Sequence, residues 1–140
     1  MTIPGNVELR LSDQLWKRPD YKMVNEAFAK LGISDSDDFA EFFRKFWGPF
    51  HSTKFGHELL DVIEQDESIL SNTETAREEY GFPDNFVILS TVLGHSVLVY
   101  DANSGLVYDV DFEGGDELLK AGTLSPRWPS WKAFISDYFS

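Results

Sequence analysis

The central part of the chain, where three strand-like runs are separated by two glycine turns, constrains the fold most strongly. The runs 86–92, 96–102 and 106–112 are rich in β-branched and aromatic residues and predict three consecutive strands. Gly94-His95 suits a two-residue type II′ turn, and Asn103-Ser104-Gly105 suits a three-residue loop with glycine in the left-handed conformation. The sequence therefore predicts an antiparallel three-stranded β-meander.

The lengths of these turns determine which residues lie opposite each other, and therefore which side chains share a face of the sheet. We expect Tyr100 to lie opposite Tyr108, and Leu98 opposite Val110. One face is then wholly apolar and predicted to be core: Val87, Leu89, Leu98, Tyr100, Leu106, Tyr108, Val110 and Phe112. The other face begins with Phe86, Ile88, Val97 and Val99 and ends in an anionic edge: Asp101, Asp109, Asp111 and Glu113.

Helical patterns precede the meander. Apolar residues at helical spacing predict a helix over 24–31, stopped by Gly32. A second helix over 39–47 carries five aromatic residues on one face. Ser36 suits its N-cap, and Gly48-Pro49 is expected to end it.

Further elements complete a single α+β domain. Residues 131–139 place apolar side chains at helical spacing and predict a helix that docks on the rest of the domain. A short helix is expected over 73–80, Gly114-Gly115 approach another, and residues 7–11 alternate like a weak strand. Helices first, a sheet in the middle and a helix last indicate one α+β domain over residues 1–140.

The charge balance excludes several classes of partner. Twenty-four Asp and Glu face twelve Lys and Arg, which gives a formal net charge of −12 and a pI near 4.5. Such a field repels nucleic acids and anionic membranes and attracts basic proteins, although acidity that serves solubility alone is the simpler alternative. There is no cysteine, no signal-peptide pattern and no apolar run of the roughly 20 residues that a membrane helix needs. We expect a cytoplasmic protein.

The sequence shows no convincing catalytic or metal-binding pattern. His51, His57 and His95 lack the spacing of a metal pair, and His95 falls in a predicted turn. Ser52, His57 and Asp61 can be combined into a nucleophile, base and orienting group, but no Gly-x-Ser-x-Gly elbow supports that triple. We therefore expect no catalytic residue, no metal and no cofactor. A small hydrolase or sugar-binding enzyme would require a pocket that gathers histidine with carboxylates.

Two surface features favour protein binding instead. The acidic clusters at 61–67 and 101–113 are typical of a solvated face or a docking surface, because the later ligand positions of a calcium loop are apolar. Trp16, Trp128 and Phe50 lie outside the periodic faces, which makes them candidates for exposed anchors, with packing on the domain as the alternative.

The order of several short segments resembles a known family. The aromatic helix ends in Trp-Gly, and a Gly-Phe-Pro-Asp segment, the meander and an amphipathic helix follow. The segments are Phe46-Trp47-Gly48-Pro49-Phe50, Gly81-Phe82-Pro83-Asp84, Val99-Tyr100-Asp101, Gly105-Leu106-Val107-Tyr108 and Ser130-Trp131-Lys132-Ala133-Phe134-Ile135. This order is similar to the SUKH superfamily of Smi–Knr-type proteins over roughly residues 31–139. Leu31-Gly32-Ile33 stands where many members carry Leu-Pro, which leaves the subfamily open.

The resemblance implies an α+β fold, and it favours a strand over 58–63, where the residue pattern alone leaves strand and helical turn open. Many members are immunity proteins that neutralise bacterial polymorphic toxins, and others are cell-wall-synthesis regulators that act through protein contacts. It implies an immunity protein that occludes a cognate toxin, with a regulatory scaffold as the alternative; the acidity suits a basic toxin such as a nuclease. By surface character, the expected partner-binding residues are Phe50, Glu58, Asp61, Asp101, Asp109, Asp111 and Glu113.

Overall fold

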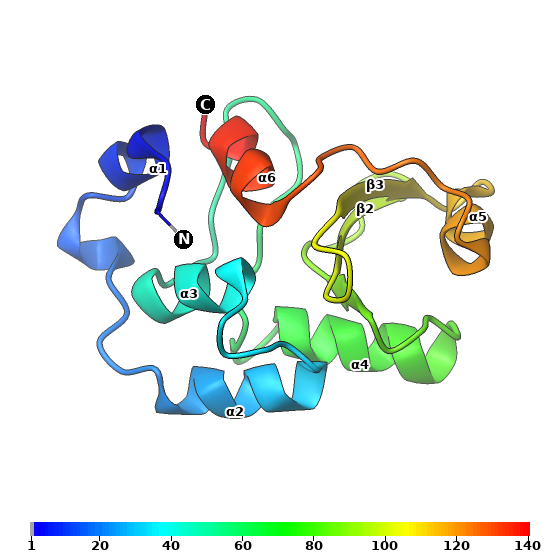
Figure 1. Ribbon diagram of the computed structural model, residues 1–140, viewed down its shortest axis with the longest axis horizontal. Helices are drawn as coiled ribbons and strands as arrows, with labels where there is room; N and C mark the ends of the chain where they lie inside the picture. The colour runs from blue at the N-terminus through cyan, green and yellow to red at the C-terminus, as the bar shows by residue number, and fades with distance from the viewer. Residues whose placement is uncertain (1) are drawn as a thin grey trace.

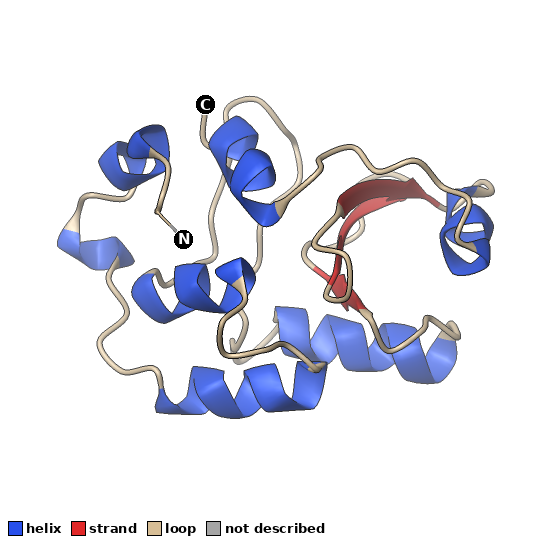
Figure 2. Cartoon of the chain, in the orientation of Figure 1, coloured by secondary structure: helices blue, strands red, loops and turns tan. Residues whose placement is uncertain are grey.

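A curved three-stranded sheet lies between two groups of helices in the computed structural model, which describes residues 2–140 (Figure 1). Helices and one antiparallel sheet confirm the predicted α+β class (Figure 2). The elements are α1 (Gly5–Arg10), the 3-10 helix η1 (Gln14–Trp16), α2 (Lys22–Leu31), α3 (Asp38–Lys45), α4 (Ile69–Glu79), β1 (Phe86–Ile88), β2 (Ser96–Asp101), β3 (Val107–Asp111), α5 (Gly115–Ala121) and α6 (Trp131–Tyr138).

The predicted meander is confirmed, with a shorter first strand. β1 pairs with β2 and β2 pairs with β3, both antiparallel. Leu93 and Ser96 exchange backbone hydrogen bonds of 2.8 and 3.1 Å around the predicted two-residue turn, and Gly94 has φ +61°. β1 ends at Ile88 because Ser90 meets β2 through its side chain, whose hydroxyl accepts from the backbone N–H of Leu98.

The expected register between β2 and β3 is wrong by one residue. Tyr108 lies opposite Val99, and Val110 lies opposite Val97. The cause is Asp101, whose backbone N–H donates to Leu106 and whose carboxylate accepts from the N–H of Asn103 and the hydroxyl of Ser104. These bonds make the loop four residues long, 102–105, where three were expected. A shift of one residue moves every β3 side chain to the opposite face.

Both faces of the sheet are covered by helices. The inner face packs on the main core with α3 and α6, where Tyr100 stacks on Phe39 at a centroid distance of 5.2 Å. The outer face carries α4 over β1 and α5 over β3. Figure 1 shows α4 beneath the sheet and α5 at its far end. The outer face therefore lacks the acidic half that was expected: Phe86, Ile88, Val97, Val99, Tyr108 and Val110 are all buried there.

The weak strand predicted over 7–11 is wrong. This segment belongs to α1 and its C-cap, because Val7 and Leu11, four residues apart, are buried while Leu9 points to solvent.

The predicted cap and end of the aromatic helix are also corrected. Asp37 rather than Ser36 caps α3, accepting from the N–H of Phe39 at 2.9 Å, and the helix ends at Lys45 rather than at residue 47.

The chain after α3 is extended. Phe46 forms an isolated bridge with Lys17, and the N–H of Trp47 donates to the carbonyl of Trp16 at 2.8 Å. The strand expected over 58–63 is also absent from the described chain. Leu59 instead forms isolated bridges to Phe50 and Ser90, so this segment only extends the edge of the sheet.

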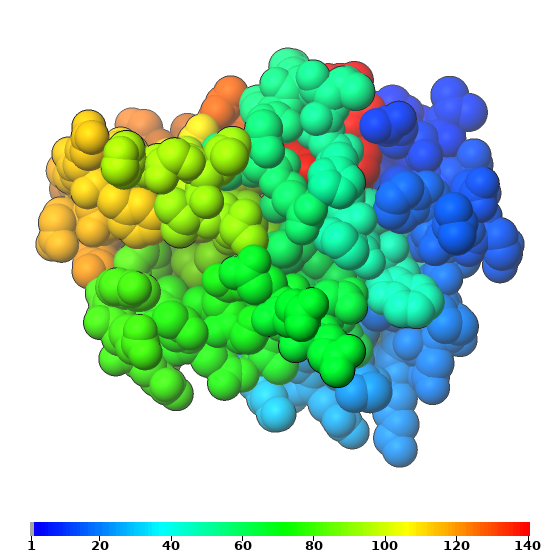
Figure 3. Space-filling model, turned by 180° about the vertical axis from the view of Figure 1, so that it is seen from behind, coloured from blue at the N-terminus to red at the C-terminus, as the bar shows by residue number. Residues whose placement is uncertain are grey.

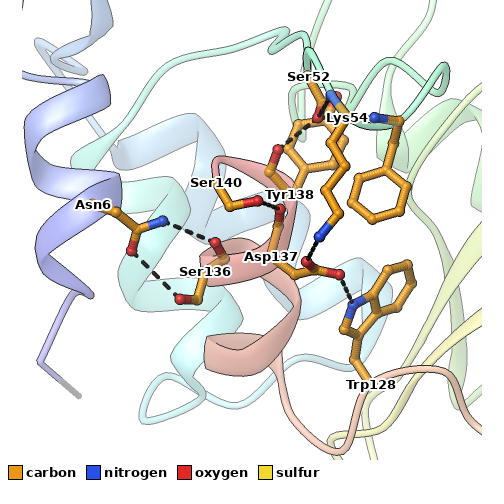
Figure 4. Close-up of polar contacts among 9 residues, drawn as sticks. Asn6, Ser52, Lys54, Trp128, Ser136, Asp137, Tyr138 and Ser140 are labelled. Carbon is orange, nitrogen blue, oxygen red and sulfur yellow. Dashed lines mark hydrogen bonds and ion pairs between the residues drawn. The ribbon is translucent and has the colours of Figure 1, made fainter.

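The predicted C-terminal helix is confirmed as α6, which begins after Ser130 and buries its apolar face. Figure 4 shows its polar contacts: Asn6 of α1 bonds to Ser136, and Ser52 donates to the carbonyl of Tyr138 at 2.6 Å. The Tyr138 hydroxyl accepts from the N–H of Leu59 and lies 2.7 Å from the carbonyl of His57. Burial raises the pKa of Tyr138 to about 12, which keeps this hydroxyl protonated.

Asp137 is expected to make stability depend on pH. Hydrogen bonds from Lys54 and from the Trp128 indole hold the pKa of Asp137 below its ordinary value of 3.8. Its contribution is therefore present above pH 3.8 and lost as the pH falls through the lower folded-state pKa. We expect the difference in free energy of unfolding between the wild type and Asp137→Asn to be constant above about pH 5 and to shrink toward about pH 3. Urea titrations at several pH values measure it, and a constant difference throughout contradicts the assignment.

Gly48 is expected to be needed for packing. A Cβ at this position would lie 2.8 Å from the buried ring of Phe50, which is held by other aromatic rings. Gly48→Ala should therefore lower the free energy of unfolding by about 1–3 kcal/mol. Gly5→Ala is the matched control, because a Cβ there meets nothing within 4 Å, and it should leave stability unchanged or higher. Equal urea midpoints for the two variants would refute this packing argument.

Candidate protein-binding groove

The seven residues predicted for a partner surface do not form one surface. Phe50 and Asp61 lie in the interior, and Asp101 is buried in a turn. Glu58 is half-buried, and its carboxylate lies 3.4 Å from the imidazole of His51. The remaining three, Asp109, Asp111 and Glu113, lie on β3 and just after it, in three different environments.

Asp61 forms a buried ion pair. Its carboxylate accepts from the Arg18 guanidinium at 2.5 Å and from the N–H groups of Gly48 and Ile63, and the two charged side chains are 0% and 3% exposed. Burial raises the pKa of Asp61, and Arg18 and the two backbone donors oppose that rise. The prediction that Asp61 contacts a partner is wrong, because no exposed atom of it is available.

Asp101 and Phe50 are also structural. Burial raises the pKa of Asp101, but hydrogen bonds from Asn85, Ser104 and the N–H of Asn103 outweigh it, so the net shift is downward. Phe50 packs against Trp16 at 5.4 Å between ring centroids. For Phe50 and Trp128, packing rather than exposure is observed, and Trp16 is half-buried against the core.

The three acids around the end of β3 diverge because of the register shift. Asp109 turns to the inner face, where it forms an ion pair with Arg127 at 2.7 Å. Asp111 accepts from the N–H groups of Glu113 and Gly115 and so holds the entry to α5. Glu113 is exposed. Asp111 is exposed as well, so these two acids are accessible to solvent while Asp109 is paired.

The triple that sequence reasoning assembled for catalysis is not brought together. Ser52 donates to the carbonyl of Tyr138, His57 Nε2 lies 3.0 Å from the hydroxyl of Ser96, and Asp61 pairs with Arg18. His95 is exposed, as its place in a turn predicted. Within residues 2–140, no group of three or more His, Cys, Asp or Glu side chains is arranged to hold a metal ion.

A groove opens beside the outer face where the end of α4, the β1–β2 connection and the segment from β3 into α5 meet. Two adjoining cavities of about 80 and 560 Å³ occupy it, and the buried side chains of Ile88 and Val97 line the smaller one. We call this the α4–α5 groove; four apolar residues line both cavities: Tyr80, Phe82, Val92 and Phe112. On the back of the molecule, the end of α4 (green), the β1–β2 connection (yellow-green) and the segment after β3 (amber) meet (Figure 3).

The α4–α5 groove presents apolar side chains inside an acidic rim. Tyr80 is 62% exposed and Phe112 is 40% exposed, so two large apolar side chains face solvent close together. Three carboxylates and one ammonium line the larger cavity: Glu79, Asp116, Glu117 and Lys120. Three acids against one lysine make this rim negative. An apolar centre with a charged rim is the arrangement of a protein interface.

Sequence reasoning missed this groove, because none of the seven predicted partner-binding residues lines it. The incorrect register assigned Phe112 to the core, and Val92 was placed within a strand. Tyr80 had only the usual role of a helix end before Gly81. No local signal separates Phe112 from Val110, which also lies between two acids and is fully buried.

Comparison with known proteins adds no family. No protein-family model matches the chain, and no curated protein matches it. The resemblance to the SUKH superfamily therefore stays a prediction. In the described part of the chain, no helix is both long enough and apolar enough to cross a bilayer.

Asp61, which is buried, and Glu113, which is exposed, should differ in their contribution to the free energy of unfolding. Asp61→Ala leaves the Arg18 charge buried without its partner and should lower the free energy of unfolding by about 3–5 kcal/mol. Glu113→Ala removes an exposed carboxylate and should change it by less than about 0.5 kcal/mol. Urea denaturation followed by circular dichroism measures both. Similar losses in the two variants would contradict the interior role of Asp61.

Proposed function

We propose that this chain is an immunity protein of the SUKH type, which binds a cognate bacterial toxin and neutralises it by occlusion. The observation that carries the proposal is the α4–α5 groove, where exposed apolar side chains lie inside an acidic rim. The similarity in the order of sequence elements supplies the functional class, and the groove supplies a surface that suits it.

Charge complementarity selects the kind of toxin. The chain has a net charge of −12, and the groove rim holds Glu79, Asp116 and Glu117 against a single Lys120. A basic surface is steered toward such a rim, and its apolar side chains then bury Tyr80 and Phe112. A nuclease domain has such a basic surface, because it binds phosphates, and carboxylates on the immunity protein would take the place of those phosphates.

Neutralisation by covering the toxin, rather than by a chemical reaction, agrees with the positions of the side chains that could react. The hydroxyl of Ser52, the imidazole of His57 and the carboxylate of Asp61 each have a separate partner inside the fold. The groove supplies area and charge rather than a nucleophile beside a base. Neutralisation by covering the active site of a toxin needs only that area and charge, placed on elements that a sheet holds in position.

The test uses the product of the neighbouring gene, expressed in a host whose growth it arrests. The wild-type chain should restore growth and form a complex with that protein. Glu79→Lys, Asp116→Lys and Glu117→Lys, combined, should weaken binding about 100-fold at low salt, because attraction becomes repulsion at the rim. Titration calorimetry measures the affinity, and growth measures protection.

The matched control changes the same total charge away from the groove. Glu26→Lys, Asp66→Lys and Glu67→Lys alter exposed acids on α2 and before α4 and should weaken binding far less. Equal losses in the two triple variants would refute the groove as the contact surface. A wild-type chain that neither binds the neighbouring protein nor restores growth would refute the immunity function itself.

A further inference from the structure

A second pocket lies on a different part of the surface, beside the end of α3. It has a volume of about 440 Å³. Its walls are apolar and include Trp47, which is 44% exposed, and Met23, which is 67% exposed, together with Pro19 and Ile63. In Figure 3 the blue N-terminal segments, the turquoise segment after α3 and the green segment before α4 meet in this region. We call it the Trp47 pocket.

Arg18 also lines the Trp47 pocket, and its side chain is only 3% exposed. Two of its three guanidinium nitrogens are used inside the fold. Nε donates to the carbonyl of Phe43 at 2.5 Å, and Nη2 donates to the carbonyl of Phe46 at 3.3 Å and to Asp61 at 2.5 Å. These bonds fix the guanidinium in one orientation.

The third nitrogen, Nη1, has no hydrogen-bond partner among the described residues. Among the described residues, two side-chain nitrogens are fully enclosed and lack a hydrogen-bond partner: Nε of Arg77 and Nε1 of Trp131. Nη1 of Arg18 is not fully enclosed in this way. Nη1 therefore keeps some accessible area, and Arg18 is one of the residues that line the Trp47 pocket. A fixed donor in an apolar pocket is a binding feature, because a donor left without an acceptor there is costly.

The surrounding charges select the kind of acceptor. Asp61 already offsets the charge of Arg18, and Asp20 and Glu64 line the same pocket without a basic residue other than Arg18 among its lining. A carboxylate entering the pocket would meet these two acids, in a chain of net charge −12. An uncharged carbonyl oxygen accepts from Nη1 without that repulsion.

We propose that the Trp47 pocket binds a small uncharged molecule that combines a ring or branched apolar group with a carbonyl oxygen. The apolar group lies against Trp47 and Met23, and the carbonyl accepts from Nη1 of Arg18. The α4–α5 groove contributes none of the residues involved, so the proposal is independent of the toxin-binding function.

The test compares three probes of similar shape, benzamide, benzoate and toluene, by NMR titration of the isotope-labelled chain. Benzamide should shift the indole N–H of Trp47, the methyl group of Met23 and the Nε–H of Arg18. It should bind about tenfold more tightly than toluene, which lacks the acceptor, and more tightly than benzoate, which carries the charge. Toluene or benzoate binding as tightly as benzamide overturns the proposed recognition.

Variants locate the binding. Trp47→Ala should weaken benzamide binding at least about fivefold, because it removes one wall of the pocket. Tyr80→Ala, an exposed aromatic residue of the α4–α5 groove, is the control and should leave the affinity unchanged. If circular dichroism shows that Trp47→Ala is unfolded, Met23→Ala takes its place, with the same expectation. Unchanged affinity in the folded wall variant, or an equal loss in Tyr80→Ala, overturns the assignment of the site.

Discussion

The buried ion pair between Arg18 and Asp61 organises the irregular half of this domain. Arg18 satisfies carbonyl groups at the end of α3, and Asp61 satisfies the N–H groups of Gly48 and Ile63. Buried backbone groups without partners are costly, and here regular structure does not supply the partners. Two side chains therefore hold the two ends of the segment 46–63, which has no helix or strand of its own.

The three-stranded sheet organises the other half of the domain, and the α4–α5 groove lies where the helices that cover its outer face end. Tyr100 links the inner face to α3, because its ring stacks on Phe39 and its hydroxyl donates to the capping residue Asp37 at 2.6 Å. On the outer face, α4 and α5 lie over the two edge strands, and Val97 and Val99 of the middle strand are buried between them. The inner face is thus packed against the aromatic core. Beside the outer face, the apolar side chains of Tyr80 and Phe112 remain in contact with solvent.

Elements with local signals could be predicted from the sequence, and elements redirected by aspartate side chains could not. The helix stopped by Gly32, the turn at Gly94 and the helix after Ser130 follow from periodicity and glycine position alone. Asp101 lengthens a loop by one residue, and Asp61 turns the segment expected to be a strand. The spacing of apolar residues does not indicate such hydrogen bonds between a side chain and the backbone. The same bonds explain why two predicted interface acids, Asp61 and Asp101, are interior.

The position of α6 in the sequence has a consequence for synthesis. Trp131, Phe134 and Tyr138 complete the core around rings contributed by α3, so the aromatic residues near Phe42 have no finished environment until α6 is made. The hydroxyl that orders the segment around Leu59 also belongs to this helix. A ribosome that has made everything up to α5 therefore holds a chain whose aromatic core is still open. Closure of the domain has to wait until α6 has left the exit tunnel, and chaperones have the longest access to the N-terminal half.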